Sequence, residues 1–404
     1  MNTNKQRNWF LRNGFFQTVA SSLLCILLGL LVGYIVLLII NPKGAWEAIL
    51  TILKNFMTYS KESLKLKNFG NTLAKTAPLL MCSLSILFCY KVGLFNIGAA
   101  GQYVAGTAAA LSGALIFKWD WWMCLLFAVV VSAAYGAIVG FLKAYCNVNE
   151  VISGIMLNWI ALYATNMILT NVKEVASPYT LKLKDFATSA MLPVLGGENP
   201  WLGSKYMTIA IPVVLILAIL IKVLLDFTKF GYELKATGYN KNAAKYAGMA
   251  EKRNIIVTLA IGGALAGLGG ALFYLTDYEQ WSCSMSSVPG MGFNGIAAAF
   301  LGGLDPIGSI FSSYFIQHIT AGGAYVDKTM YSAQISDLIS SFIIYLCGFV
   351  LFFKLTLNKI LDKADEKAIA KAKMAEAAKV AETIQPEPDI TAPQDSENTE
   401  GGKE

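Results

Sequence analysis

Charged residues are scarce in this sequence: Asp, Glu, Lys and Arg make up 14% of its 404 residues. A soluble globular domain carries about 25% charged residues, so the composition argues for a protein in contact with lipid. The net charge is +6, but the basic residues lie at the ends of apolar segments and form no patch. This distribution argues against nucleic acid as a partner.

Residues for catalysis and metal binding are also few. None of the seven cysteines lies in a CxxC pair, which argues against a zinc site or a disulfide framework. No GxxxxGK[ST], HExxH or GxSxG motif occurs. We therefore expect no catalytic residue, no metal and no cofactor, and any ATP that drives the protein must be bound by another chain. The single histidine, His318, is more simply interpreted as a helix-packing residue than as a proton relay.

Long apolar runs with at most one charged residue are abundant, and a membrane-spanning helix needs about 20 apolar residues. The candidate runs are Gly14–Ile40, Asn71–Tyr90, Gly98–Phe117, Trp121–Leu142, Val151–Thr170, Tyr206–Leu225, Asn254–Thr276, Asn294–Leu304, Pro306–Ala324 and Gln334–Phe353. The run Asn294–Leu304 is too short to span the bilayer alone, which indicates a re-entrant segment. The sequence thus predicts an all-α polytopic membrane protein with about ten transmembrane helices.

Lysine and arginine in short loops mark the cytoplasmic side of a membrane protein. They gather before the first run, between residues 227 and 253, and after the last run. We therefore expect both termini in the cytoplasm and an external loop at 172–205. The lysine-rich segment Asn41–Gly70 conflicts with this orientation, because it would lie outside.

The expected organisation is a cytoplasmic N-terminus at 1–13, a transmembrane domain at 14–355 and a cytoplasmic tail at 356–404. Within the tail, Lys363–Glu382 is rich in Ala, Lys and Glu and should form a polar or fluctuating helix. Gln385–Glu404 has no apolar periodicity and is predicted to be disordered.

A weak internal echo indicates two related halves. Gly93–Ile97 reads GLFNI and Gly292–Ile296 reads GFNGI, and small residues follow each segment. Glycine-interrupted segments in matching positions of two halves point to a translocation site. The amides nearby are costly in lipid, so they either join helices or line a polar path: Asn96, Gln102, Asn158 and Asn294. Asp305 is interpreted as the N-cap of a helix beginning at Pro306.

The segment Gly238–Gly248 has the pattern of a docking helix. Small residues share one helical face through their i, i+3, i+4, i+7 spacing: Asn240, Ala243, Ala244 and Ala247. Gly238 precedes this helix, and Gly248 can end it in a left-handed turn. A solvated linker does not need such a face, so we expect another protein to dock there.

These motifs resemble a known family. Gly238–Gly248 is similar to the coupling-helix motif of ABC importer permeases, in which a Gly follows an Ala-Ala pair. GLFNIGAAGQ at 93–102, the run Asn149–Asn158 and Gly292–Gly308 resemble the branch for simple sugars, nucleosides and branched-chain amino acids. Within it they most resemble nucleoside permeases that work with basic-membrane-lipoprotein-type binding proteins. The resemblance covers about residues 70–355.

One departure concerns Ala100. The family segment usually reads GLFNIGAEGQ, so this chain has alanine where a glutamate is expected. That puts in doubt any role resting on the acid, and it is a difference expected of one half of a heterodimeric pore.

The resemblance implies an importer in a bacterial cell membrane. Its partners would be a cytoplasmic ABC ATPase, a second and paralogous permease subunit, and an extracytoplasmic solute-binding lipoprotein. It implies alternating access, with ATP binding transmitted through the docked helix. A nucleoside base could stack on Phe95 or Phe293, with hydrogen bonds from the four amides named above. A simple sugar or a branched-chain amino acid is the alternative solute.

An ion-coupled secondary transporter is the rival from another class. It would need paired acidic or histidine residues buried at mid-membrane. The sequence places Lys75 and His318 near helix interiors but shows no clear carboxylate pair, which counts against this alternative.

Overall fold

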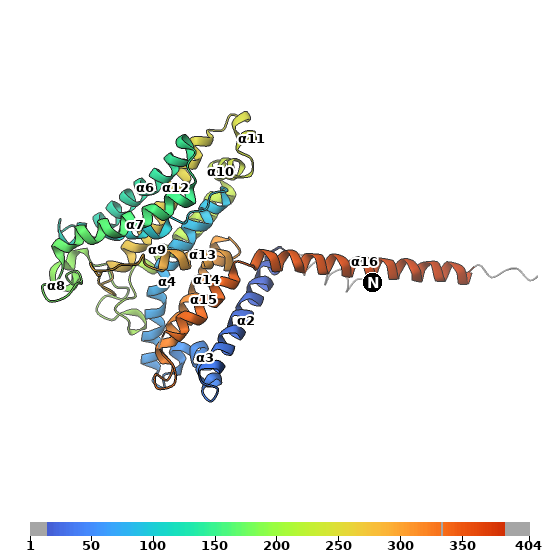
Figure 1. The fold of residues 1–404 in the computed structure, drawn as a ribbon, viewed down its shortest axis with the longest axis horizontal. Helices are drawn as coiled ribbons and strands as arrows, with labels where there is room; N and C mark the ends of the chain where they lie inside the picture. The colour runs from blue at the N-terminus through green and yellow to red at the C-terminus, as the bar shows by residue number, and fades with distance from the viewer. Residues whose placement is uncertain (1–13, 333, 384–404) are drawn as a thin grey trace, which may run out of the picture. The chain divides into compact units, whose positions relative to one another are not determined.

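The structure is a computed structural model that describes residues 14–332 and 334–383. The chain divides into two compact units, 1–353 and 354–404. The described residues form helices (Figure 1), and their only β-type pairings are isolated bridges, among them Lys173–Thr180 and Tyr179–Ser282. The predicted all-α class is therefore confirmed for the part of the chain that the structure describes.

The first unit contains the following α-helices: α2 (Gly14–Ile40), α3 (Ala45–Lys54), α4 (Glu62–Lys91), α5 (Ala99–Leu115), α6 (Trp121–Cys146), α7 (Glu150–Leu169), α8 (Leu183–Phe186), α9 (Ala210–Phe227), α10 (Lys229–Tyr239), α11 (Lys241–Tyr246), α12 (Glu251–Tyr274), α13 (Met291–Leu301), α14 (Pro306–Gly322) and α15 (Ile335–Cys347). Short 3-10 turns lie at Asn55–Thr58, Thr170–Val172, Thr188–Ala190, Trp201–Gly203 and Gly323–Tyr325.

Among the described residues, six helices are long and apolar enough to cross a membrane: α2, α4, α6, α7, α9 and α12. The helices α13 and α15 are apolar but shorter, and α5 and α14 have 17 residues each. The arrangement is that of a polytopic membrane protein, and α13 has the short length predicted for its segment.

The observed bounds differ most from the predicted ones at α4. This helix begins at Glu62, whereas the predicted apolar run begins at Asn71. Residues 62–70 contain no proline, and Lys65 pairs with Glu62 at 2.9 Å, so the polar first turns continue the helix. The predicted loop Asn41–Gly70 is therefore shorter and contains α3.

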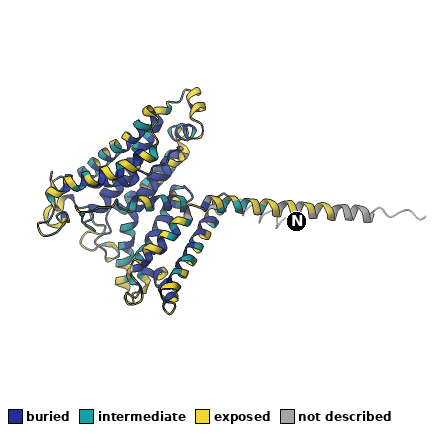
Figure 2. Cartoon of the chain, viewed as in Figure 1, coloured by how far each residue is buried: buried dark blue, intermediate teal, exposed yellow. Residues whose placement is uncertain are grey.

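The helices α4 and α12 form the centre of the first unit. The apolar window of α4 is 89% buried and that of α12 is 67% buried, against 22% for α2. Figure 2 shows the buried residues along these inner helices and the exposed ones on the outer helices and loops. A helix buried on all sides needs neighbours all round it, and α12 packs against α4, α5 and α6.

Small residues allow this close packing. A Cβ on Gly106 of α5 would lie 2.3 Å from the Cα of Gly267 on α12, and a Cβ on Gly263 would lie 2.3 Å from the carbonyl oxygen of Ser132 on α6. Backbones approach closely only where side chains are small. The interval Gly263–Gly267 is thus a helix-packing surface.

A second hydrophobic cluster joins α2, α3, α14 and α15. His318 lies at its edge, where its Nε2 is 2.9 Å from the carbonyl oxygen of Leu53 and its own carbonyl accepts from Asn55 Nδ2 at 2.7 Å. These contacts tie α14 to the end of α3, so the packing interpretation of His318 is supported.

The helix α16 (Val350–Thr383) contains the segment Lys363–Glu382, which was expected to be a polar or fluctuating helix. The N-terminal segment 1–13 and the predicted disordered segment Gln385–Glu404 lie outside the described residues.

Candidate functional site

The predicted docking segment contains the short helix α11, bounded by its own caps. The side chain of Asn240 accepts a hydrogen bond from the Ala243 amide at 3.0 Å, which satisfies a free donor of the first turn. Gly248 has φ +78°, a left-handed conformation, and the Met249 amide donates to the Ala244 carbonyl at 3.0 Å. Both ends of the helix are therefore fixed locally.

Most of α11 is exposed to solvent (Figure 2). Ala244 turns inward and is 4% exposed, whereas Asn240, Ala243 and Ala247 are exposed. The four residues expected on one face thus divide between a buried contact and an open surface. Figure 1 shows α11 at one tip of the first unit, far from α8.

Two exposed aromatic residues at the ends of α11 lie outside the small-residue pattern of the sequence. Tyr239 is 91% exposed and Tyr246 is 93% exposed. Exposed aromatic side chains are enriched among the residues that anchor protein interfaces. Their seven-residue spacing within a lysine-rich loop is the pattern that could have identified them.

The preceding helix α10 connects α11 to the central helix α4. A Cβ on Gly238 would lie 2.4 Å from the carbonyl carbon of Val92, which follows α4, and Gly93 beside it has φ +75°. Only glycine fits so close a backbone approach without displacement. Asn254 of α12 also donates to Thr237 Oγ1 at 2.9 Å. Gly238 is therefore part of α10 and joins the docking segment to the end of α4.

A group of charged residues links the same region to α14. Lys222 of α9 contacts Asp226 at 3.0 Å and also contacts Asp305, and Lys235 of α10 lies 3.3 Å from Asp226. Asp305 Oδ2 accepts from the Ile307 amide at 3.0 Å, so the predicted N-cap is confirmed. Asp305 therefore both caps α14 and holds a lysine of α9.

The amides of the GLFNIGAAGQ segment bond to each other inside the protein. Asn96 Nδ2 donates to Gln102 Oε1 at 2.8 Å and to Ser85 Oγ at 3.0 Å, and Gln102 Nε2 donates back to Asn96 Oδ1 at 3.2 Å. Asn96 is 2% exposed and Gln102 is 1% exposed. These bonds match the helix-joining alternative, and a contact with solute stays a prediction.

Asn158 of α7 holds the same segment from the other side. Its Oδ1 accepts from the Gly101 amide at 2.7 Å and its Nδ2 donates to the Ile97 carbonyl at 3.1 Å. Both are backbone groups at the break before α5, which lack helical partners of their own. Asn158 therefore fixes the path of the chain between α4 and α5.

The second echoing segment packs on the start of α5, just after the first segment, and on α4. A Cβ on Gly292 of α13 would lie 2.4 Å from the Cα of Ala100, and one on Gly295 would lie 2.7 Å from the Cβ of Cys82. Ala100 is 1% exposed, so the small side chain at this position allows α13 to approach α5. On the same helix Phe293 is exposed and Asn294 half-buried, while Phe95 is half-buried before α5.

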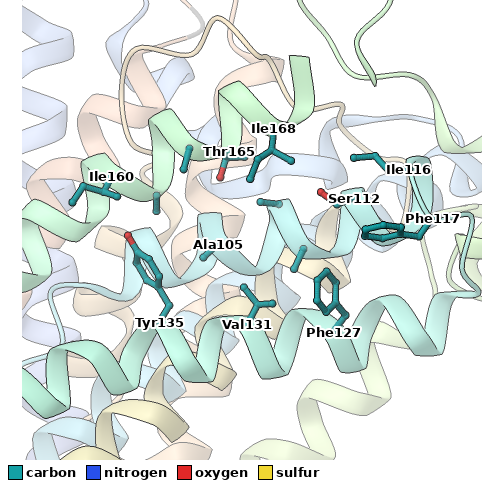
Figure 3. A pocket seen from close by; sticks show the side chains of 14 residues that line it. Ala105, Ser112, Ile116, Phe117, Phe127, Val131, Tyr135, Ile160, Thr165 and Ile168 are labelled. Carbon is teal, nitrogen blue, oxygen red and sulfur yellow. The ribbon is translucent and has the colours of Figure 1, made fainter. Parts of the chain in front are cut away.

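A cavity of about 350 Å³ lies between α5, α6 and α7. Figure 3 shows side chains from these helices pointing into it, including Tyr135, Phe127 and Ile160. Its lining is apolar apart from Ser112, Tyr135 and Thr165, and the Tyr135 hydroxyl already donates to the Leu157 carbonyl at 2.7 Å. It contains none of the predicted pathway residues and offers little to a polar solute.

The loop at 172–205 is attached to the segment after α12. Glu174 accepts from Gln280 Nε2 at 2.9 Å and from Ser177 Oγ at 2.8 Å. These hydrogen bonds, with Gln280 contributing most, lower the pKa of Glu174. The fully buried Trp281 donates from Nε1 to Asn166 Oδ1 at 2.9 Å. The loop is thus held to the segment after α12 by hydrogen bonds and is not an unattached linker.

Comparison with known proteins shows the family to which the chain belongs. The model of the branched-chain amino acid transport system permease component matches residues 68–348. The chain belongs to this family. No solved structure matches it significantly.

The similarity extends to named permeases. The chain is 31% identical over 299 residues to the guanosine ABC transporter permease protein NupP of Bacillus subtilis (strain 168), covering 73% of this chain and 84% of that protein. It is 29% identical over 362 residues to the nucleoside ABC transporter permease protein NupB of Lactococcus lactis subsp. cremoris (strain MG1363), covering 86% and 95%. A second B. subtilis guanosine permease protein, NupQ, is 27% identical over 253 residues, covering 60% and 77%.

The resemblance inferred from the sequence is therefore confirmed. The chain is a permease component of an ABC importer in a cell membrane, a transport subunit whose ATPase is a separate protein.

Proposed function

We propose that this chain translocates nucleosides. The observation that carries the proposal is its similarity to a guanosine permease and a nucleoside permease over 84% and 95% of their lengths.

The proposed topology has about ten crossings and two related halves, with both termini in the cytoplasm. It adds α5, α14, α15 and the short α13 to the six long apolar helices. The basic segment 227–253 then lies on the cytoplasmic side and the ordered loop 172–205 on the external side. The proposed domains remain a cytoplasmic N-terminus at 1–13, a transmembrane domain at 14–355 and a cytoplasmic tail at 356–404.

The ATPase docks on α11 in this proposal. Asn240, Ala243, Ala247 and Gly248 offer an exposed surface of small residues, and Tyr239 and Tyr246 supply aromatic anchors at its ends. Ala244 and Gly238 attach that surface to the rest of the protein.

Two sets of contacts would carry movement of α11 into the membrane. One runs through α10 and Gly238 to the end of α4. The other runs from Lys235 through Asp226 and Lys222 to Asp305 at the start of α14. Rigid helices joined by packed and charged contacts are the usual carriers of coupling.

The solute path is bordered by the two glycine-broken segments. Phe95, Phe293 and Asn294 keep exposed surface and would contact the solute. Asn96, Gln102 and Asn158 would hold the wall of this path, because their amides are bonded to the break before α5. Weak contacts suit a permease, since tight binding would slow release.

Two further partners complete the proposed assembly. A solute-binding lipoprotein would meet the external face, and a paralogous permease would form the other half of the pore. The similarity of this chain to both NupP and NupQ of one organism supports a pair of different permeases. Ala100 fits such a pair, in which the two subunits need not be identical.

The test is uptake of labelled guanosine by cells that express the complete transporter, with unlabelled competitors. Unlabelled nucleosides should compete, and ribose and branched-chain amino acids should not. Competition by ribose or by leucine alone would overturn the proposed substrate. Uptake that persists after deletion of the ATPase gene would instead favour the ion-coupled alternative.

A further inference from the structure

Lys75 is a charged residue inside the most buried membrane-spanning helix, α4. Its side chain is half-buried, and its ammonium lies 5.0 Å from the ring centroid of Tyr278. Among the described residues it forms no ion pair. A cation inside a spanning segment is costly and usually serves a function, and contact with a ring does not satisfy its hydrogen-bond donors.

The ring beside Lys75 belongs to a small aromatic group. Tyr278, just after α12, lies 4.5 Å from Tyr206, just before α9, with an angle of 56° between the rings. Phe273 packs behind Tyr278 at 5.8 Å and is buried. Tyr206 and Tyr278 are only half-buried, so both rings keep surface that a ligand can reach. Burial raises the pKa of Tyr278, and its phenol therefore stays protonated.

An acidic group lies near this cation without pairing to it. Asp337 of α15 interacts electrostatically with Lys75 but forms no ion pair with it. Asp337 also lines a crevice of about 540 Å³ with Tyr331, Ser332 and Gln334, a volume within the usual range of small-molecule sites. Asp337 is thus the one residue of this crevice that interacts with Lys75 among the described residues.

We propose that Lys75, Tyr206 and Tyr278 form a binding site for the heteroaromatic base of the transported solute. This inference rests on the proposed nucleoside transport. The accessible parts of the two tyrosine rings offer aromatic surface for contact with a planar base. The ammonium donates to an acceptor on the base edge, as lysine does to the O6 and N7 atoms of guanine.

The chemistry of the base edge gives the site a preference. A 6-oxopurine presents two neighbouring acceptors, O6 and N7, to the ammonium. Adenine presents only N7 there, because its 6-amino group is a donor. Lys75 therefore favours guanosine and inosine over adenosine, whereas stacking on the tyrosines favours every nucleoside.

The experiment compares KM and kcat for uptake of labelled guanosine and adenosine by the complete transporter in proteoliposomes. Lys75→Met removes the donors and keeps the length, Lys75→Arg keeps the charge, and Tyr278→Leu removes the ring. Lys252→Met is the matched control, because Lys252 lies 4.6 Å from the ring of Tyr145, outside this aromatic group, and is exposed.

Lys75→Met should raise KM for guanosine roughly tenfold, the loss expected for one charge-assisted hydrogen bond, with a smaller change for adenosine. Lys75→Arg should raise KM for guanosine less than Lys75→Met does, because it keeps a charged donor. Tyr278→Leu should raise KM for both nucleosides, and Lys252→Met should change the KM of neither.

A guanosine KM unchanged in Lys75→Met, or equal losses for guanosine and adenosine, would show a merely structural lysine and overturn the inference. If Lys75→Met fails to insert, the Lys75→Arg and Tyr278→Leu variants decide: unchanged KM values in both would overturn it as well. Wild-type protein that imports another solute and no nucleoside would overturn the proposed function too. Normal nucleoside uptake with an unaffected Lys75→Met would overturn this inference alone.

Discussion

At the scale of single residues, each side-chain nitrogen and oxygen of the buried amides at the break before α5 has a hydrogen-bond partner. Asn96 and Gln102 exchange hydrogen bonds, and Ser85 accepts another from Asn96. A buried polar group that loses its partner costs more than the bond itself contributes. These side chains should therefore be sensitive to substitution even if no solute touches them.

Asn96→Ala would leave both polar atoms of the Gln102 amide without their partner. We expect the free energy of unfolding to fall by about 1–3 kcal/mol, measured as a lower Tm of the purified protein in detergent. Asn171→Ala is the control, because Asn171 is exposed and makes one long hydrogen bond of 3.4 Å. A Tm loss no larger than that of the control would contradict the assigned role.

Glu174 predicts a pH dependence of stability. Hydrogen bonds from Gln280 and Ser177 lower its pKa in the folded state. A carboxylate with a lowered folded pKa stabilises the protein fully above its unfolded pKa, about 4.3, and the contribution is lost as pH falls through the folded value. The difference in Tm between wild type and Glu174→Gln should therefore shrink between about pH 6 and about pH 3. A difference that stays constant would show that the ionised carboxylate does not matter.

At the scale of elements, the start of α14 depends on one carboxylate with two functions. Asp305 accepts from the Ile307 and Gly308 amides at 3.0 and 3.3 Å and also contacts Lys222. The cap contributes about 1 kcal/mol. The ion pair contributes less, because both side chains are about one-third exposed.

Replacing Asp305 with asparagine and with alanine separates these functions. Asp305→Asn keeps an acceptor for the cap and loses the ion pair, whereas Asp305→Ala loses both. We expect Asp305→Ala to lower the free energy of unfolding by about 1–2 kcal/mol and Asp305→Asn by less than 1 kcal/mol, both measured by thermal unfolding in detergent. Equal losses in the two variants would show that the cap adds nothing.

The helices that could be predicted from the sequence are those that form because of residues close to one another along the chain. Uncharged runs gave the bounds of α2 because its length and composition decide whether it enters lipid. The end of α11 was readable from Gly248 because a left-handed residue acts within one turn. The N-cap, Asn240, was instead expected on the face of the helix. By contrast, α10 is charged and was not predicted; its formation depends on the burial of Leu234 and the approach of Gly231 to Leu224.

The site was less predictable than the helices, because its contacts join distant parts of the chain. No local pattern shows that Ala244 turns inward while Ala243 stays exposed. The pairing of Lys222 with Asp305 and the contact of Lys75 with Tyr278 depend on how four helices pack. The sequence thus predicts the segments, whereas the direction of each side chain depends on contacts between distant parts of the chain.

At the scale of the whole molecule, α4 connects the features that transport would need to coordinate. It carries Lys75 in its interior and Ser85 of the amide group, and the turn after it receives Gly238 of the docking segment. A central helix buried on all sides cannot move without its neighbours. A movement of α11 should therefore displace the residues at the break before α5.

Ala243→Arg tests whether α11 is the point of entry for that movement. Ala243 is exposed, and its amide is held by the Asn240 side chain, so the substitution should leave the fold and membrane insertion intact. A long cationic side chain there would hold a docked protein away from the helix. Nucleoside uptake and the stimulation of ATPase activity should fall below about a tenth of wild type, as expected for loss of a central interface contact. The same substitution at Ala364, an exposed alanine of α16, should change neither. Normal transport by Ala243→Arg would rule out docking on this surface. An arginine would project from a surface of small residues, so a protein docked there would lose affinity.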